Sequence, residues 1–411
     1  MTPGLAQARG LQLNPRLAPQ AKTVLMAAWK DRRDEIEILA PGAIGILTSG
    51  STQSQANEVS IVILSEAAVL ASAAAVNQHL ALKSQHVWGL MLPTFHVGGY
   101  MIPERAALSN SRVAIFNEDW NPSAAVQFLA ANAVTHLSWV PTQVFDVVTA
   151  GLAAPASLEA VIVGGGRLDP SLKARGRELG WPLLESYGMT EFGSQIATEC
   201  VAAKSLNTSS FVSAGWMKTL PHVEVESEVE GTLGRLKVRG SSGFSGHLVV
   251  DLSTGESRLL QRENREDFWL TQDRVEILRN AEGVWLKFLG RAVDVVKVLG
   301  ENVDLARVRR AIAEVFSQSS YSGKDVQVAG WEIVALPDAR REHEIVLALE
   351  SGKTQFSGSN FLSQLQLELK NTLAPFELPT RVCEVPNIPR SSLGKVKFPE
   401  LRELLTEASK I

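Results

Sequence analysis

The stretch HLSWVPTQVFDVVTAGLAAPASLEAVIV, residues 136–163, decides how this chain folds. It begins with a short apolar run, His136 to Val140, continues into a segment of helical period after Pro141, and returns to an apolar run, Ala160 to Val163. Short apolar runs rich in β-branched residues are typical of strands buried on both faces. Strand, helix and strand in this order indicate a mostly parallel sheet with helices against it.

The same alternation extends from about Gly42 to Glu185 and predicts an α/β domain with helices on both faces of its sheet. Ligands of such sheets bind at loops beyond the carboxyl ends of the strands. Asn121 before Pro122, and Asp169 before Pro170, are expected to cap helices. The other predicted strands are Ala43 to Leu47, Val87 to Leu92 and Arg112 to Phe116, and the predicted helices are Glu66 to Leu82, Pro122 to Asn132 and Pro141 to Ala150.

The sequence changes in character after about Asn207. Short alternating strands with Gly-rich turns run to about Leu289 and predict an antiparallel β subdomain. Helical patterns at about Asp304 to Phe316 and Ser359 to Thr372, with strands between them, indicate a separate small α+β unit. We therefore predict an amino-terminal domain over residues 1–290, β-rich over about 207–289, and a carboxy-terminal domain over residues 291–411.

Composition restricts the class of partner. The chain has 411 residues, 45% of them hydrophobic, and a formal net charge of −4, so no strongly basic surface for nucleic acid or an anionic membrane is expected. No apolar stretch reaches the ~20 residues that a membrane span needs, and the first residues lack the order of a signal peptide. Two cysteines, Cys200 and Cys383, fit a reducing cytoplasm. The expected partners are small molecules or a second copy of the chain.

Two runs of small and polar residues follow predicted strands. In Thr48-Ser49-Gly50-Ser51-Thr52, backbone N–H groups and hydroxyls could hold phosphate oxygens, although an ordinary Ser/Thr turn would have the same composition. No Gly-Lys-Ser/Thr follows, so this run is not a Walker loop. In Ser186-Tyr187-Gly188-Met189-Thr190-Glu191, the aromatic could stack on a base, the threonine reach a phosphate and the carboxylate hold Mg²⁺. The loop Gly164-Gly165-Gly166, at another strand end, favours a functional role for Glu191 over a solvated surface carboxylate.

Together these runs resemble the adenylate-forming superfamily, which contains acyl- and aryl-CoA synthetases, luciferases and peptide-synthetase adenylation domains. Within it, the chain resembles the o-succinylbenzoate–CoA ligases of menaquinone biosynthesis, most of all in Val140-Pro141-Thr142-Gln143 and in Phe192 after Thr190-Glu191. The segments that carry the resemblance follow the order of the family: Thr48 to Thr52, Pro93 to Gly99, Gly164 to Gly166, Ser186 to Glu191, Thr271 to Arg274, Gly290 to Asn302 and Pro389 to Lys395.

The resemblance implies a ligase that uses ATP, Mg²⁺ and coenzyme A, with a mobile carboxy-terminal domain that carries a catalytic lysine, Lys395. It implies that Asp273 accepts the ribose hydroxyls, that Arg291 contacts phosphate or ribose, and that His96 lies against the acyl pocket where the thiol enters. Phe95 and Thr142 belong to the same acyl site. Arg105 would face this pocket if Gly99 to Leu108 is helical, and could pair with a second carboxylate of an aromatic diacid; a surface arginine is the alternative.

Three features depart from the family pattern. Gln53 to Asn57 stands where the family has Gly-x-Pro-Lys-Gly, Val293 occupies the hinge position, and the phosphate loop begins only at Thr48, which suggests a shortened amino-terminal subdomain or a dimer contact in its place. These departures leave open a slow or divergent enzyme. The alternatives are another acyl- or aryl-CoA ligase, an adenylation enzyme that loads a carrier protein, and a catalytically decayed module that binds a nucleotide or acyl-CoA.

Overall fold

The structure is a computed structural model. It describes residues 9–47, 58–166, 168–200, 215–229, 233–291, 295–299, 301–317, 330–338, 340–351, 361–391, 394 and 396–407. The chain divides into two compact units: one comprises Met1–Thr271 and Val275–Phe288, and the other comprises Gln272–Arg274 and Leu289–Ile411.

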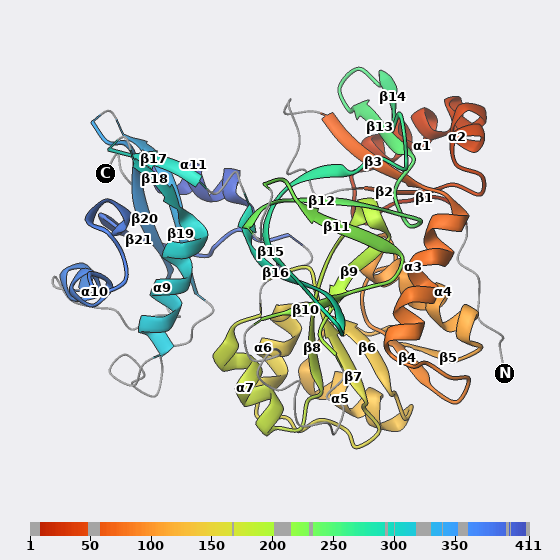
Figure 1. The fold of residues 1–411 in the computed structure, drawn as a ribbon, viewed down its shortest axis with the longest axis horizontal. Coiled ribbons are helices and arrows are strands. Elements are labelled where there is room, and N and C mark those ends of the chain that lie inside the picture. Colours follow the sequence, from red (N-terminus) through yellow and green to blue (C-terminus); the bar gives the residue numbers. More distant parts are fainter. Residues whose placement is uncertain are drawn as a thin grey trace. The chain divides into compact units, whose positions relative to one another are not determined.

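An eleven-stranded sheet dominates the first unit (Figure 1). Strands β5, β4, β6, β7 and β8 are neighbours in that order and are all parallel, whereas β8 pairs antiparallel with β9 and β10 pairs antiparallel with both β9 and β16. The predicted α/β class is therefore confirmed. The strands of this sheet are β4 (Val87–Leu90), β5 (Arg112–Ile115), β6 (His136–Trp139), β7 (Ala160–Val163), β8 (Leu183–Met189), β9 (Ser194–Thr198), β10 (Met217–Thr219), β11 (Val223–Ser227), β12 (Leu233–Gly240), β15 (Trp269–Asn280) and β16 (Gly283–Arg291).

A five-stranded sheet lies in the same unit. Its order is β1-β2-β3-β13-β14, with β1 parallel to β2 and the other pairs antiparallel. Its strands are β1 (Gly10–Gln12), β2 (Ile44–Leu47), β3 (Glu58–Leu64), β13 (Gly246–Asp251) and β14 (Ser257–Gln261).

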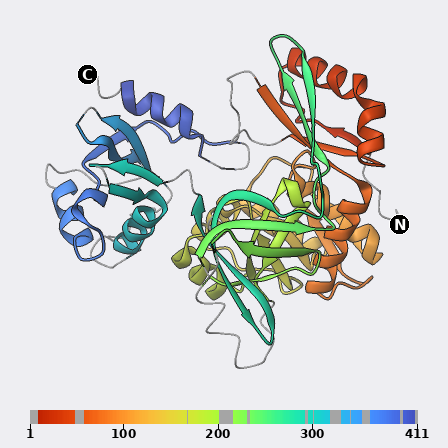
Figure 2. The same ribbon diagram turned by 45° about the horizontal axis from the view of Figure 1, so that its top comes forward.

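Helices cover both faces of the five-stranded sheet and of the parallel strands in the eleven-stranded sheet. Helices α5, α6 and α7 bury one face of the parallel strands, and α3 and α4 fill the space between their other face and the five-stranded sheet. Helices α1 and α2 close the far side of the five-stranded sheet (Figure 2). The first unit thus has five alternating layers of helix and sheet. Its helices are α1 (Pro19–Asp31), α2 (Arg33–Leu39), α3 (Glu66–His79), α4 (Val97–Ser109), α5 (Pro122–Ala131), α6 (Pro141–Thr149) and α7 (Pro170–Glu178).

The helix starts follow local chemistry. The Asn121 side chain accepts a hydrogen bond from the Ala124 amide, and the Asp169 carboxylate accepts bonds from the amides of Ser171 and Leu172. Each cap satisfies backbone N–H groups that have no partner inside the helix. Both predicted caps are confirmed, and a proline follows each of them in the first turn.

The β-rich stretch does not form a sheet of its own. Its antiparallel pairs are present, but β11, β12, β15 and β16 extend the eleven-stranded sheet while β13 and β14 extend the five-stranded one. Alternation along a strand predicts which side chains are buried, and it does not specify the neighbouring strand.

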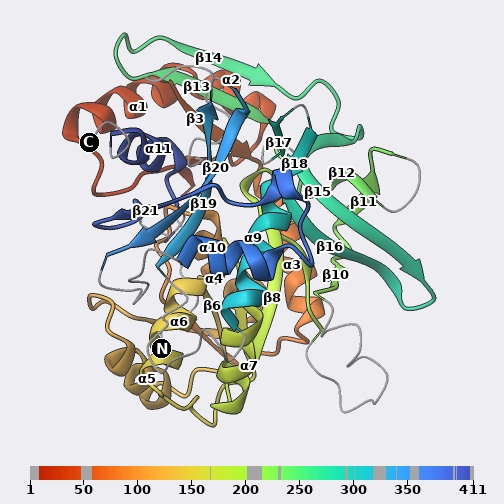
Figure 3. The same ribbon diagram turned by 90° about the vertical axis from the view of Figure 1, so that its left-hand side faces the viewer.

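The second unit has its own core around a three-stranded sheet, β19-β20-β21 (Figure 3). Helices α9 and α10 bury one face of this sheet, and α11 buries the other. Its elements are β17 (Val295–Val298), β18 (Glu301–Asp304), α9 (Leu305–Ser317), β19 (Trp331–Asp338), β20 (Glu342–Glu350), α10 (Phe361–Leu369), β21 (Arg381–Val385) and α11 (Phe398–Glu407). No helix in the described ranges of either unit has the length and apolar character of a membrane span.

Candidate active site

Four neighbouring parallel strands, β4, β6, β7 and β8, point their carboxyl ends to one edge of the large sheet. The segments at that edge carry most of the described residues that the sequence predicts as site residues. They are Phe95 and His96 after β4, Thr142 at the start of α6 after β6, Gly164 to Gly166 after β7, and Ser186 to Glu191 where β8 continues beyond its parallel pairing. The topology therefore gathers residues from distant parts of the chain along one edge.

The loop between β4 and α4 is tightly folded. A side chain on Gly99 would place its Cβ 2.2 Å from the Pro93 carbonyl oxygen, so only glycine fits there. His96 is the residue that precedes α4, with a half-buried side chain whose ring centroid lies 4.5 Å from that of Phe95. The predicted acyl-site pair thus lies at the amino-terminal end of a helix.

The segments after β6, β7 and β8 touch one another. Ser186 Oγ donates to the Val163 carbonyl at 3.2 Å, and a Cβ on Gly164 would lie 2.9 Å from the same Oγ. A Cβ on Gly166 would lie 3.4 Å from Pro141, next to Thr142. The three glycines therefore leave backbone exposed beside Ser186, as a loop that holds a base or a phosphate requires.

The hairpin from β8 to β9 carries the Ser186–Glu191 segment. It has an irregular register between Tyr187 and Gly188, and a Cβ on Gly188 would lie 1.7 Å from the Ser194 carbonyl oxygen. A short 3-10 helix, Thr190–Phe192, then reverses the chain, and Gly193 and Ser194 both have positive φ angles, 64° and 97°. This close approach of the two strands fixes where Thr190 and Glu191 emerge.

Tyr187 and Glu191 occupy different environments. The Tyr187 ring is buried and stacks on Phe288, with centroids 5.4 Å apart and planes at 21°. The Glu191 side chain is 24% exposed, its carboxylate lies 4.0 Å from His247 Nε2, and burial lowers the pKa of His247 to about 4. His247 is therefore neutral at pH 7 and places no positive charge beside the Glu191 carboxylate.

Magnesium fits this donor set. Mg²⁺ is commonly held by one or two carboxylates together with substrate phosphates, so a single carboxylate such as Glu191 would be sufficient if a nucleotide supplied the phosphates. Within the described ranges, no group of three or more His, Cys, Asp or Glu residues forms an all-protein metal site.

Arg105 lies inside α4 and is completely buried, so the alternative of a surface arginine is wrong. Its Cζ lies 5.8 Å from the centre of the Trp88 ring, and among the described residues no carboxylate lies within 4.0 Å of its nitrogens. Burial lowers the pKa of Arg105 to about 9. A guanidinium in such a place is a strong candidate for binding an anion.

A family model with the description "AMP-binding enzyme" matches residues 42–248, slightly more than half of the chain. The chain belongs to the AMP-binding enzyme family. The matched range contains the whole edge described above, from the loop after β4 to the β8–β9 hairpin.

Within this AMP-binding family, the chain is similar to the 2-succinylbenzoate–CoA ligase of Staphylococcus epidermidis, with 26% identity over 80% of this chain and 63% of that protein. The chain thus spans less than two thirds of the length of that curated relative. It has the fold of the o-succinylbenzoate-CoA synthetase of Bacillus subtilis in complex with its acyl-adenylate intermediate, at a TM-score of 0.69 and 22% identity over 87% of this chain and 68% of that one. The same Bacillus enzyme with ATP and magnesium ion gives a TM-score of 0.67 and 21% identity over 87% and 69% of the two chains.

Two predicted nucleotide contacts of this AMP-binding protein belong to the second unit. Asp273 and Arg291 form an ion pair, with Arg291 Nε 3.1 Å from Asp273 Oδ1. The Asp273 side chain is 11% exposed and that of Arg291 is 42% exposed. The predicted phosphate loop, Thr48 to Thr52, and the predicted hinge and catalytic residues, Val293 and Lys395, lie outside the described residues.

Sequence reasoning missed two buried polar groups beside the predicted site. Lys173 Nζ donates to the carboxylates of Glu185 at 2.6 Å and Glu199 at 2.5 Å, next to Ser186 on β8. Gln195, directly after the hairpin, lies beside the Arg105 guanidinium. Charged and amide residues in isolation are usually solvated, so neither group has a distinctive pattern in the sequence.

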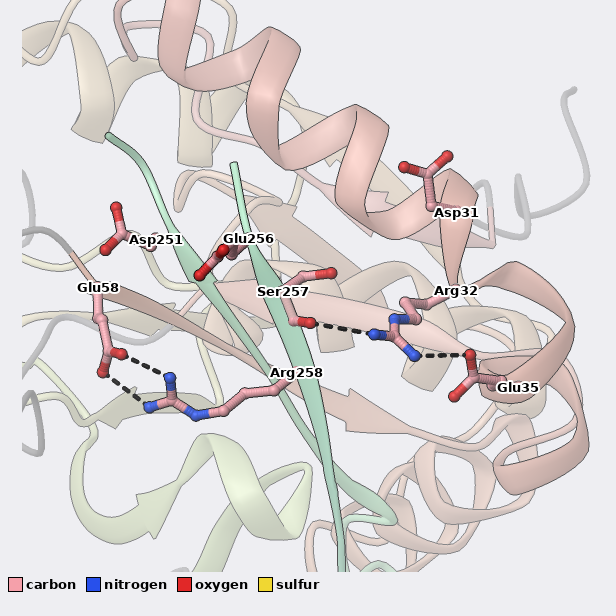
Figure 4. Close-up of a pocket in the computed structure, with 8 residues that line it drawn as sticks. All are labelled: Asp31, Arg32, Glu35, Glu58, Asp251, Glu256, Ser257 and Arg258. Atoms are coloured by element: carbon pink, nitrogen blue, oxygen red, sulfur yellow. Dashed lines mark hydrogen bonds and ion pairs between the residues drawn. The ribbon is translucent and has the colours of Figure 1, made fainter. Parts of the chain in front are cut away.

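A cleft of about 710 Å³ lies elsewhere in the first unit, between the α1–α2 junction, β3 and the β13–β14 hairpin (Figure 4). Its two arginines point to carboxylates: Arg258 pairs with Glu58 and Arg32 with Glu35. None of the predicted site residues lines it. The cleft is a polar hollow whose two arginines are each paired with a carboxylate, and it contains none of the predicted site residues.

Proposed function

We propose that this chain is an ATP-dependent acid:thiol ligase, which converts a carboxylic acid to its acyl-adenylate and then to a thioester of coenzyme A. The observation that carries the proposal is the arrangement of the β4, β6, β7 and β8 segments along one sheet edge in a member of the AMP-binding family. The names and complexes of its relatives agree with this activity.

In the first step, the acid carboxylate attacks the α-phosphorus of ATP and pyrophosphate leaves. The Gly164–Gly166 loop and the Ser186–Met189 segment hold the nucleotide, with Thr48 to Thr52 around the phosphates, while Thr190 contacts phosphate and Glu191 holds Mg²⁺. Magnesium, when bound, offsets the charge on the phosphates. Lys395 offsets the charge that develops between the carboxylate and the α-phosphate.

In the second step, the thiol sulfur attacks the acyl carbon and AMP leaves. The unit over residues 291–411 acts as the mobile domain: it presents Lys395 for adenylation and then moves about the segment near Val293 to withdraw it. Asp273 and Arg291 contact the nucleotide. His96, at the start of α4, lies where the thiol reaches the acyl group. Adenylation makes this attack effective because AMP is a much better leaving group than oxide.

The acid proposed for this site is o-succinylbenzoate, an aromatic diacid. One carboxylate is activated, and the second pairs with Arg105, whose buried guanidinium has no carboxylate neighbour among the described residues. Phe95 and Thr142 are the other residues proposed to line the acyl site. Arg105→Ala should raise KM for the diacid at least tenfold more than for a benzoate without the second acid, because the charged contact is worth about 1.5–3 kcal/mol.

The activity is tested by pyrophosphate release with Mg·ATP over a panel of acids, with and without coenzyme A. Release with o-succinylbenzoate is expected to fall about 100-fold in Lys395→Ala. The matched control is Lys397→Ala, because Lys397 lies nearby in the chain and pairs with Glu400 on the surface at 2.7 Å. Equal loss in both variants would contradict the role of Lys395.

Other outcomes separate the remaining functions. Turnover of a different acid would support the ligase activity and change the assigned substrate. Transfer to a carrier-protein thiol would change the assigned acceptor from coenzyme A to a carrier protein. ATP binding without turnover of any acid identifies a decayed binding module, as the missing phosphate-loop lysine and Val293 would suggest. A homodimer, a cytoplasmic location and the lack of nucleic-acid or membrane partners stay predictions.

A further inference from the structure

Arg105 requires an explanation of how its guanidinium is held. The side chain is 0% exposed, and the described contacts of its terminal nitrogens are the Trp88 ring and the side chain of Gln195 on β9. Arg105 Nε and Trp88 Nε1 have no hydrogen-bond partner among the described residues. A flexible cation that forms few hydrogen bonds in the interior needs a group that fixes its direction.

We propose that Gln195 is a positioning residue that aims the Arg105 guanidinium at the second carboxylate of the substrate, and that Thr198 holds Gln195 in place. This inference rests on the proposed function and adds to it a pair of residues that sets the preference for diacids. It concerns side chains that neither touch the reacting atoms nor bind the nucleotide.

The contact geometry supports a relay of three side chains. Gln195 is 4% exposed and Thr198 is 0% exposed. With the Gln195 amide oriented to satisfy both neighbours, its nitrogen donates to Thr198 Oγ1 at 2.6 Å and its oxygen accepts from Arg105 Nη1 and Nη2 at 3.3 Å each. One oxygen that bridges both terminal nitrogens restricts rotation of the guanidinium. The Thr198 hydroxyl can donate or accept, so it bonds to the amide in either orientation, and the Arg105 donors decide that the Gln195 oxygen faces them.

The absence of charge on Gln195 matters as much for the proposed role as its position does. A carboxylate there would form a permanent internal ion pair and would compete with the substrate. An amide oxygen instead orients the cation and leaves its charge for a ligand. His222 lies close enough for the Arg105 charge to affect it, and burial, with that charge as a smaller cause, lowers the pKa of His222 to about 4. His222 is therefore also neutral at pH 7.

The test uses the full-length chain and the variants Gln195→Glu, Gln195→Leu and Thr198→Val. The matched control is Asn77→Ala, because Asn77 Nδ2 donates to the Arg105 backbone carbonyl at 2.8 Å and supports the same helical turn without contact to the guanidinium. The kcat/KM of pyrophosphate release is measured with o-succinylbenzoate and with benzoate. Gln195→Glu should lower the diacid-to-monoacid ratio about tenfold or more, Gln195→Leu and Thr198→Val should lower it less, and Asn77→Ala should leave it unchanged.

A second measurement does not depend on activity. Gln195→Glu should raise the midpoint of thermal unfolding when Arg105 is present, because it supplies the missing counter-charge, and should lower it in the Arg105→Met background, where it buries an unpaired acid. If no acid is turned over, the proposed function fails. The comparison of Gln195→Glu with and without Arg105→Met then tests by itself whether Gln195 contacts the Arg105 guanidinium. Equal effects of Gln195→Glu in both backgrounds, or equal losses for both acids, would overturn the inference.

Discussion

At the scale of single residues, the buried guanidinium of Arg105 is expected to cost stability. Its guanidinium is buried without a carboxylate partner among the described residues, in a layer of apolar side chains between α3, α4 and the large sheet. Burying an uncompensated charge is unfavourable, and proteins retain such groups mainly where a ligand completes them. The proposed contact with the second carboxylate of the substrate would supply the counter-charge that Arg105 lacks among the described residues.

Replacement of Arg105 by methionine is therefore expected to stabilise the protein. The substitution keeps most of the side-chain length and removes the desolvated charge, so the free energy of unfolding should rise by about 1 kcal/mol or more. Urea denaturation at pH 7.5 without ligands measures this change. Addition of o-succinylbenzoate should stabilise the unsubstituted chain and have little effect on the variant. A less stable variant would mean that Arg105 supports the fold.

The buried side chain of His136 is expected to make the free energy of unfolding depend on pH. Its ring is 2% exposed against Trp88 and His86, and burial, with the charge of His86 as a smaller cause, lowers the pKa of His136 to about 4. Because an unfolded histidine titrates near 6.5, the unfolded chain binds more protons between pH 6.5 and 4, and stability falls as the pH decreases through this window. His136→Gln should make the decrease shallower.

Urea denaturation at pH 7.5, 6.0 and 5.0 measures this effect. The difference in unfolding free energy between His136→Gln and the unsubstituted chain should shrink at lower pH. Part of the slope should persist, since burial also lowers the pKa values of His222 and His247 to about 4. Parallel curves would show that His136 does not contribute.

At the scale of single elements, the β8–β9 hairpin is secured by a buried ion network. The Glu199 carboxylate is 0% exposed, accepts from Lys173 Nζ at 2.5 Å and from the Glu185 amide at 3.0 Å, and the Glu199 amide donates to the Glu185 carbonyl at 2.9 Å. These bonds connect α7 to the base of the hairpin, one residue before Ser186. The network thereby fixes the strand that carries the proposed nucleotide contacts.

Lys173→Met should destabilise the chain by about 3–5 kcal/mol, because it removes the nearer of two cations from the buried Glu199 carboxylate and leaves only Arg177, at 3.6 Å. Adding Glu199→Gln to that variant should recover part of the loss, since a neutral amide is less costly to bury. Lys237→Met is the control: its 3.9 Å pair with Glu226 is exposed, and a change below about 0.5 kcal/mol is expected. Thermal unfolding followed by circular dichroism compares the three.

The sequence predicts individual elements better than their partners. The strand at Ala160 to Val163 and the caps at Asn121 and Asp169 are local features, which short apolar runs and cap residues specify directly. The pairing of β12 with β15, or of β13 with β3, depends on contacts between distant segments that alternation does not encode.

The candidate site shows the same division. The glycines and Glu191 could be located because their segments have a recognisable spacing after strands. The burial of Arg105 and the position of Gln195 could not be predicted from the sequence. Arginine and glutamine side chains are usually exposed, and only the packing of the folded chain determines which faces of a helix or strand are covered. The ion pair between Asp273 and Arg291 likewise arises from pairing within the second unit.

At the scale of the whole molecule, each unit has a hydrophobic core of its own. Trp331 is the one tryptophan of the 411-residue sequence that belongs to the second unit, where its ring packs edge-on against Phe316 at 5.4 Å. The fluorescence difference between the unsubstituted chain and Trp331→Phe therefore reports unfolding of that unit. We expect its urea midpoint to differ from the midpoint of far-ultraviolet circular dichroism, since separate cores unfold with separate free energies. Superimposed transitions would indicate one cooperative unit.

The close approach at Gly188 has a consequence for engineering. With a Cβ there only 1.7 Å from the Ser194 carbonyl, every other amino acid forces the hairpin to open. In a randomised library aimed at new acids, codons at position 188 would yield almost no folded members other than glycine. Positions 95 and 142 are better choices for randomisation, because Phe95 and Thr142 lie at the starts of helices. The sequence of the hairpin can then stay unchanged through successive rounds of selection.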